Sequence, residues 1–262
     1  MNLEKTPLRI WVLARNDGEA VEIERLLKQA DEHALISRQI WGASWRGLEE
    51  EIRRELVRFQ EEHPEGVIYG IELAGPEQLG AVNIDHHRYR DEDRSHPLSS
   101  LEQVAEIMGV ELDGRQQLVA ANDRGYIPAM LELGATDAEV DDVRRQDRQA
   151  QGITSEDEEQ AEKDLAAAKW LGAKVDVWCP QRATSAHSDR LYGVAEEALL
   201  RSPDQWEYYG PKHRRLAECG FSEHHWSGGR PESGFFGIKS PSAETREQIW
   251  LLFQEPMGKA AD

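Results

Sequence analysis

An aspartate followed by two adjacent histidines is the pattern in this sequence that offers the most chemistry. Asp85, His86 and His87 follow the apolar run 81–84, which is typical of a buried strand. One carboxylate and two imidazoles supply oxygen and nitrogen donors together, which suits Mn²⁺, Mg²⁺ or Zn²⁺ rather than a metal that prefers thiolates. An ordinary hydrogen-bonded loop is the alternative, because a tripeptide alone is a weak motif.

Other acidic residues follow further apolar runs in the first half of the chain. These runs and their acids are 8–14 with Asp17 and Glu19, 67–71 with Glu72, and 118–121 with Asp123. Helical patterns lie between the runs, so we expect a parallel sheet with right-handed crossovers. Ligands bind at the carboxyl ends of the strands in such sheets. We therefore expect these acids to meet the two histidines at one edge of the sheet.

The segments between the expected strands have the apolar spacing of helices. This spacing occurs over 20–27, 48–59 and 101–108. The residues from Ser99 to Glu102 have the pattern of a capping box, and Gly109 is expected to end the helix that begins there.

Composition and charge predict three parts along the chain. Residues 1–135 form the expected α/β domain, the highly charged segment 136–172 is expected to be a helical connector, and 173–262 a smaller α/β domain. The connector is predicted to contain a helix that is capped at Ser155 and stops at Gly172. Strand candidates in the last part are 175–179, 235–238 and 249–253.

The overall composition is that of a globular protein with a strongly negative charge. A formal net charge of −19 repels polyanions, so broad binding to duplex nucleic acid is not expected. No apolar run approaches the ~20 residues of a membrane span, and the start lacks a signal-peptide pattern, which predicts a cytoplasmic protein that does not bind membranes. Two cysteines are too few for a disulfide framework.

The first half of the chain resembles the DHH phosphoesterase family. The resemblance is carried by the strand and motif 81–87, the helix that starts near Ser99, and the segment 122–125, within residues 8–135. Family members include single-strand exonucleases, oligoribonucleases, cyclic-dinucleotide and bisphosphonucleotide phosphodiesterases and inorganic pyrophosphatases. They generally use two divalent ions, often manganese. The resemblance implies a phosphohydrolase that depends on Mn²⁺ or Mg²⁺, with a parallel-sheet DHH-type N-terminal domain and a second, smaller α/β domain.

The resemblance also implies roles for the residues of the motif. His86 would be a metal ligand with Asp85 beside it in the site, and His87 would contact the substrate phosphate. Asp123 would be a further ligand. Glu72 stands where the family usually has an aspartate that bridges two metals, so its longer side chain changes the expected metal spacing.

The first family motif is weakened in this sequence. Asp17 and Glu19 look like this motif, in which the family commonly shows a histidine and two aspartates, but the histidine position falls on Leu13. One ligand of the first metal site is therefore missing. Both one-metal and two-metal chemistry remain open.

A glycine-rich segment at 226–237 looks like part of the DHH-associated C-terminal domain, with Arg230 and Pro231 in place of the usual histidine. The backbone N–H groups of Gly228 and Gly229 can approach a phosphate closely, and Arg230 can add a charge-assisted contact. Arg124, next to Asp123, is also predicted to bind substrate. A plain turn before a strand is the alternative for the glycine pair.

Three weaker patterns have simpler explanations. They are the hydrolase-type residues Ser185, His187 and Asp189, the basic residues Arg88, Arg90 and Arg94, and the tryptophans Trp41 and Trp45. No nucleophile elbow surrounds the serine, although His187 and Arg182 could line a substrate cleft. The arginines alternate with acids, which favours a solvated loop, and the tryptophans are better explained as core than as a platform for a base.

We expect hydrolysis of a nucleotide or a short single-stranded oligonucleotide. Two alternatives stay open: a nucleotide-binding or protein-interaction module that has lost catalysis, and a nuclease subunit of a larger complex that supplies the missing basic surface. Homo-oligomers are also compatible with the sequence.

Overall fold

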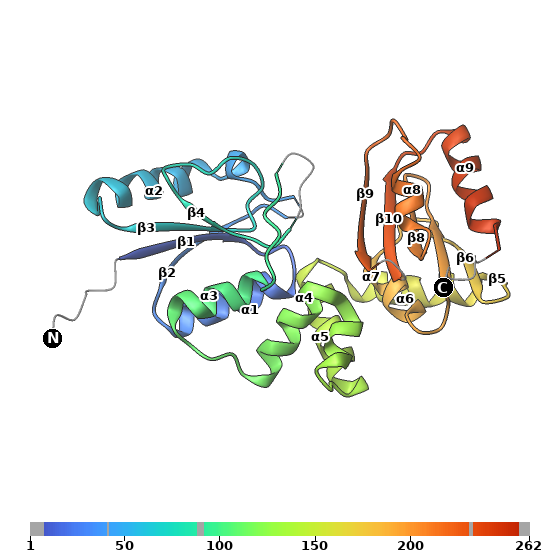
Figure 1. Cartoon of the computed structure of the whole chain (residues 1–262), viewed down its shortest axis with the longest axis horizontal. Coiled ribbons are helices and arrows are strands. Elements are labelled where there is room, and N and C mark those ends of the chain that lie inside the picture. The colour runs from blue at the N-terminus through green and yellow to red at the C-terminus, as the bar shows by residue number, and fades with distance from the viewer. Residues whose placement is uncertain (1–7, 41, 88–91, 231–232, 257–262) are drawn as a thin grey trace. The chain divides into compact units, whose positions relative to one another are not determined.

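The structure, a computed structural model, describes residues 8–40, 42–87, 92–230 and 233–256. The chain divides into two compact units, Met1–Gly152 and Ile153–Asp262 (Figure 1). The boundary lies inside the segment 136–172, which the sequence predicts as a connector. One of its helices belongs to the first unit and the other to the second.

The first unit alternates strands and helices. Its elements are β1 (Arg9–Ala14), α1 (Gly18–Gln29), β2 (His33–Ser37), the 3₁₀ turn η1 (Trp45–Gly47), α2 (Glu50–Glu62), β3 (Val67–Ile71), β4 (Val82–Ile84), α3 (Ser100–Met108), α4 (Gly114–Glu132) and α5 (Asp137–Ala150). The strands form a parallel sheet in the order β2-β1-β3-β4. The predicted α/β class and parallel sheet are confirmed.

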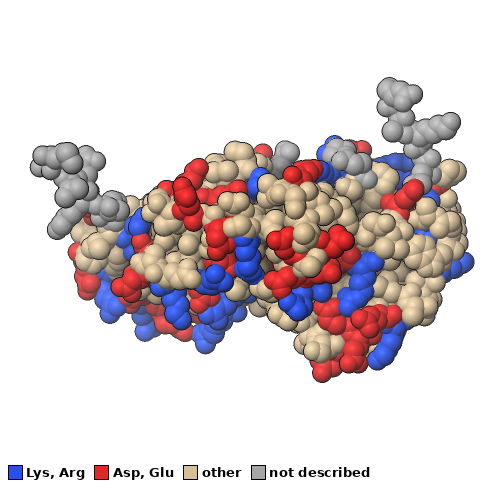
Figure 2. Space-filling model, turned by 90° about the horizontal axis from the view of Figure 1, so that it is seen from below, with Lys and Arg blue, Asp and Glu red and all other residues tan. Residues whose placement is uncertain are grey.

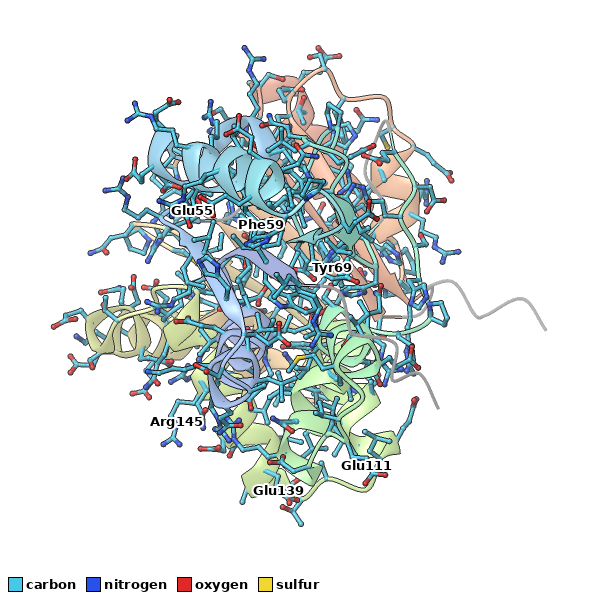
Figure 3. All side chains as sticks on the ribbon, turned by 90° about the vertical axis from the view of Figure 1, so that its left-hand side faces the viewer. Glu55, Phe59, Tyr69, Glu111, Glu139 and Arg145 are labelled. Atoms are coloured by element: carbon cyan, nitrogen blue, oxygen red, sulfur yellow. The ribbon has the colours of Figure 1, made fainter. Side chains whose placement is uncertain are left out.

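Helices cover both faces of this sheet. Trp11 and Leu13 of β1 pack with α1, α3, α4 and α5, whereas Ile10 and Val12 pack on the opposite face with α2. This alternation follows from the two-residue period of a strand. Figure 3 labels Phe59, which extends from α2 into the core on that face. The result is a three-layer arrangement that buries β1 on both sides.

The predicted start and end of α3 are confirmed. The side chain of Ser99 accepts a hydrogen bond from the backbone N–H of Glu102, whose carboxylate accepts the N–H of Ser99 in return. Gly109 ends the helix with φ of 68°, a left-handed conformation that glycine adopts without a steric penalty. This local sequence therefore determines where the N-terminus of α3 lies.

Three predictions about elements are wrong. The apolar run 118–121 lies within α4, and the run 249–253 lies within the helix α9 (Ala243–Gln254); neither is a strand. A short apolar run fits a buried helix as well as a buried strand, so periodicity cannot separate them. The helix expected to be capped at Ser155 and to reach Gly172 is capped by Thr154, ends at Ala166 and is followed by a strand.

The second unit contains a six-stranded mixed sheet. Its elements are α6 (Ser155–Ala166), β5 (Lys169–Leu171), β6 (Lys174–Trp178), α7 (Ser185–Leu191), β7 (Glu197–Arg201), β8 (Gln205–Gly210), α8 (His213–Ala217), β9 (His225–Arg230), β10 (Ser233–Lys239) and α9. The strand order is β5-β6-β7-β8-β10-β9, in which β6 and β7 are parallel and the other neighbours antiparallel. The predicted second α/β domain is confirmed. Among the described residues, no helix is long and apolar enough to span a membrane.

A close contact between β3 and η1 leads to a test of this packing. A Cβ atom at Gly70 would lie 2.0 Å from the ring of Trp45, which is 1% exposed. We expect Gly70→Ala to lower the free energy of unfolding by about 1–3 kcal/mol, because the ring has no space to move into. Gly114→Ala is the control, since nothing lies within 4 Å of its Cβ position. Equal urea-denaturation midpoints for the two variants would contradict this packing.

Candidate metal centre

Polar side chains of the first unit converge where β3 and β4 end. Glu72 follows β3, His86 and His87 follow β4, and Asp123 comes from α4. Each offers one donor atom, and these four atoms all lie within 4.8 Å of one another. A carboxylate oxygen of Glu19 lies 4.0 Å from His86 Nε2. The predicted convergence at the carboxyl edge of the sheet is present for these five residues.

His86 is at the middle of this cluster. Its Nε2 contacts Asp123 Oδ2 and lies 3.5 Å from Glu72 Oε1. Among the described residues, His86 Nε2, Asp123 Oδ2 and Glu19 Oε2 are buried but make no hydrogen bond of ordinary geometry. Buried polar atoms normally have hydrogen-bond partners, so three such atoms facing one another indicate a site for a cation.

Asp85 organises the turn that carries the two histidines. Its Oδ1 accepts hydrogen bonds from the backbone N–H groups of His86 (2.8 Å) and His87 (2.9 Å). The same oxygen lies 3.0 Å from His87 Nδ1. Asp85 is therefore placed to orient both rings, while its predicted role as a metal ligand remains a prediction.

Glu72 leaves β3 in an unusual backbone conformation. Its φ is 51°, in the left-handed region that residues other than glycine adopt at a cost of roughly 1–3 kcal/mol. Its Oε1 accepts a hydrogen bond from Ser100 Oγ (2.9 Å) and lies 3.7 Å from His87 Nδ1. Strained residues cluster at functional sites, and this one directs a buried carboxylate to the histidines.

The N-terminus of α3 holds a second long carboxylate. Glu19, 2% exposed, accepts the backbone N–H of Leu101 through Oε1 (3.0 Å). The free amides and the dipole of a helix N-terminus both favour negative charge. The start of α3 therefore positions both glutamates of the cluster, one through an amide and one through the hydroxyl of Ser100. The capping box was predicted from the sequence, but these contacts were not.

Asp123 reaches the cluster from a helix rather than from a strand end. It lies two residues before a kink in α4, where Gly125 and Tyr126 have non-helical backbone angles and Tyr126 has φ of 60°. The expectation that Asp123 would follow a strand is wrong, although its expected place beside His86 is correct. Packing of α4 against the sheet puts this carboxylate at the same edge.

The buried charged groups of the site shift one another's pKa values strongly. Burial raises the pKa of Glu19 well above its ordinary value, and the charges of Asp123 and Glu72 raise it further. Burial and the same two acids also raise the pKa of Asp17. Burial lowers the pKa of His86, but its contacts with Asp123 and Glu72 outweigh this and raise that pKa to about 10. A divalent cation would relieve this crowding of carboxylates.

The remaining predicted residues of the first unit lie around the cluster. Asp17 caps α1 by accepting the N–H of Ala20 (2.8 Å). Leu13 is fully buried in the core, so its position supplies no metal ligand. Arg124 pairs with Glu102 at 2.9 Å. Ligation by Asp17 and substrate binding by Arg124 therefore remain predictions.

Two of the weaker patterns are structural in this unit. The side chain of Arg94 is 8% exposed and donates to the carbonyl oxygens of Leu73 (2.9 Å) and Gly75 (2.6 Å), so its expected place in a solvated loop is wrong. Trp45 is part of the core. Arg88, Arg90 and Trp41 lie outside the described residues.

The glycine-rich segment lies in the second unit, and its pair Gly228 and Gly229 is part of the strand β9 rather than a turn. Gly229 pairs with Gly234 of β10, and a Cβ atom at Gly229 would lie 2.7 Å from the Cα of Gly234. A Cβ atom at Gly228 would lie 2.8 Å from the ring of Phe235. The close approach of β10 therefore explains both glycines, and phosphate binding by Gly228, Gly229 and Arg230 remains a prediction.

A second group with metal-ligand side chains is explained without a metal. Asp164, Cys179 and His187 are all buried and offer donor atoms within 4.8 Å of one another. His187 Nδ1 accepts the backbone N–H of Thr184 (3.2 Å), so the ring proton is on Nε2, which faces Asp164 Oδ2 (3.3 Å). His187 therefore caps α7. It neither lines an open cleft nor serves as a base for Ser185.

Comparisons with known proteins give likenesses to solved structures only. No protein-family model matches the chain, and no curated protein matches it significantly. The pGpG-specific phosphodiesterase PggH from Vibrio cholerae is 13% identical with a TM-score of 0.43, covering 94% of this chain and 97% of that one. A DHH domain of a protein described as a member of the s1p family of ribosomal proteins is 14% identical with a TM-score of 0.46, covering 94% and 85%. RecJ from Thermus thermophilus, solved with Mg²⁺, is 12% identical with a TM-score of 0.45, covering 95% and 50%.

The cluster leads to a test of metal binding. We expect Mn²⁺ to raise the melting temperature of the native chain, because an ion at 100 times its Kd stabilises a fold by about 2.7 kcal/mol. Asp123→Asn removes one of the converging charges and should abolish most of this rise. His96→Ala is the control, because that histidine is exposed and lies outside the cluster. An undiminished rise in Asp123→Asn would contradict the assignment of this site.

Proposed function

We propose that the chain is a phosphohydrolase that depends on a divalent metal and that its reaction centre is the cluster around His86. The observation that carries this proposal is the convergence of His86 Nε2, Asp123 Oδ2 and Glu19 Oε2 as buried atoms without ordinary hydrogen bonds. Oxygen donors together with imidazole fit Mn²⁺ or Mg²⁺. A bound ion would activate water and neutralise the charge that develops on the phosphate during hydrolysis.

His87 is the residue that we assign to the substrate. Its side chain is 45% exposed, whereas those of His86 and Glu72 are 9% and 8% exposed. Its Nδ1 faces Asp85 Oδ1, which fixes the orientation of the ring. His87 can therefore contact a phosphate from the solvent side and donate a proton to the leaving oxygen, while Asp85 holds the ring in place.

The charge of the chain favours a small phosphorylated substrate. A net charge of −19 repels long polyanions, and acidic and basic side chains are intermingled over the face shown in Figure 2. We therefore propose a nucleotide or a short single-stranded oligonucleotide as the substrate. A nuclease subunit would need a partner with a basic surface.

One observation favours a different function. Leu13 is fully buried at a position where the resemblance implies a metal ligand, so this position gives the site one donor less. A chain with this site could bind a metal and a nucleotide without turning the nucleotide over. This binding module is the second candidate function.

We expect different variants to separate Mn²⁺ binding from turnover. With Mn²⁺, the native chain should hydrolyse at least one member of a panel of pyrophosphate, a bisphosphonucleotide, cyclic dinucleotides, dinucleotides and short single strands. His87→Ala should bind Mn²⁺ normally but lower kcat by about 10²–10⁴, because it removes a proton donor. His86→Ala should lose both metal binding and turnover. Metal and nucleotide binding without turnover by the native chain would favour the binding module.

A further inference from the structure

A buried ion pair on α5 contacts the two segments, at the start of α1 and in α4, that carry acidic residues of the first unit. Arg144 and Asp147 are 6% and 5% exposed, and Arg144 Nη1 lies 2.6 Å from Asp147 Oδ2. By contrast, Glu139 and Arg145 of the same helix are exposed and lie at the periphery (Figure 3). The free energy of removing two charges from water exceeds their electrostatic attraction unless both groups make further hydrogen bonds. The further partners of this pair are therefore informative.

Asp147 holds the start of α1. Its Oδ1 accepts the backbone N–H of Gly18 (2.9 Å), the residue between the proposed ligands Asp17 and Glu19. A Cβ atom at Gly18 would lie 3.1 Å from the Cα of Asp147, which is tighter than ordinary contact. Glycine at this position therefore allows α5 to approach closely enough for the hydrogen bond. The bond fixes the backbone from which both acidic side chains extend.

Arg144 holds the kink of α4. It donates from Nη1 to Asn122 Oδ1 (3.0 Å), and Asn122 directly precedes Asp123. Its guanidinium carbon lies 4.6 Å from the ring centre of Tyr126, the residue with φ of 60° at the kink. A cation over an aromatic face is attracted to it, so this contact stabilises the strained residue. Arg144 thus contacts the chain on both sides of Asp123.

We propose that Arg144 and Asp147 are positioning residues that set the separation between the acidic residues of α1 and Asp123. The two segments belong to different helices, and the ion pair joins them through one hydrogen bond to each. This inference rests on the proposed function, because it assumes that these carboxylates hold a divalent ion. Its consequence is that the affinity for metal depends on α5, which supplies no ligand itself.

The test compares the affinity for Mn²⁺ with the stability of the fold. Free Mn²⁺ is measured by electron paramagnetic resonance during titration of the full chain, without substrate, and unfolding is measured in urea. We expect Asp147→Asn and Arg144→Met each to weaken Mn²⁺ binding by about 10–100-fold, as is usual when a partner that orients metal ligands is removed. The double variant Arg144→Met/Asp147→Leu leaves no unpaired buried charge and should weaken binding to a similar degree.

Arg9→Met is the matched control. Arg9 forms an ion pair with Glu32 in which both side chains are 14% exposed, at the start of β1 and away from the carboxyl edge. Its loss should lower stability but leave Mn²⁺ affinity within about twofold. If the folded double variant binds Mn²⁺ with the same affinity as the native chain, the positioning role is overturned and the proposed function stands. An equal loss of affinity in Arg9→Met would also overturn it, and a native chain that binds no Mn²⁺ would overturn both proposals.

Discussion

The arrangement of the first unit depends on a concentration of buried negative charge at the carboxyl edge of its parallel sheet. Glu19, Glu72 and Asp123 surround His86, and the pKa of Glu19 is raised because burial and its acidic neighbours disfavour ionisation. Such a cluster is costly unless each carboxylate has a partner. The start of α3 supplies two partners, because Leu101 N–H donates to Glu19 and Ser100 Oγ donates to Glu72. The unmatched oxygen atoms that remain face one another, which is the geometry that a divalent ion would complete.

Most of the residues at the carboxyl edge of the sheet can be predicted from the sequence, because a strand and its end are marked by an apolar run and the polar residues that follow it. The runs that form β1, β3 and β4 are apolar, and the polar residues that follow them converge as expected for parallel strands. Asp123 was placed correctly but for the wrong reason, since 118–121 is helical. Nothing local separates a four-residue strand from the buried face of a helix, and the contact of the Tyr126 ring with Arg144 joins residues that are distant in the sequence.

The charged segment 136–172 shows where composition misleads. The sequence predicts a charged helical connector here, yet its helix α5 packs in the core of the first unit through Val140 and Val143 and buries Arg144 and Asp147. In the second unit, the glycine pair of β9 has a similar explanation in packing, because β10 approaches too closely for a side chain. Long-range contacts decide both cases, and a single sequence does not reveal them.

Binding of a divalent ion by the atoms around His86 is tested most directly by anomalous X-ray diffraction from crystals of the full chain soaked in Mn²⁺, recorded above and below the manganese absorption edge. We expect an edge-dependent peak within coordination distance of His86 Nε2 and of carboxylate oxygens from Asp123, Glu19 and Glu72. A difference map without a peak at this position in fully soaked crystals, or with manganese bound only elsewhere on the chain, would contradict a metal centre at His86.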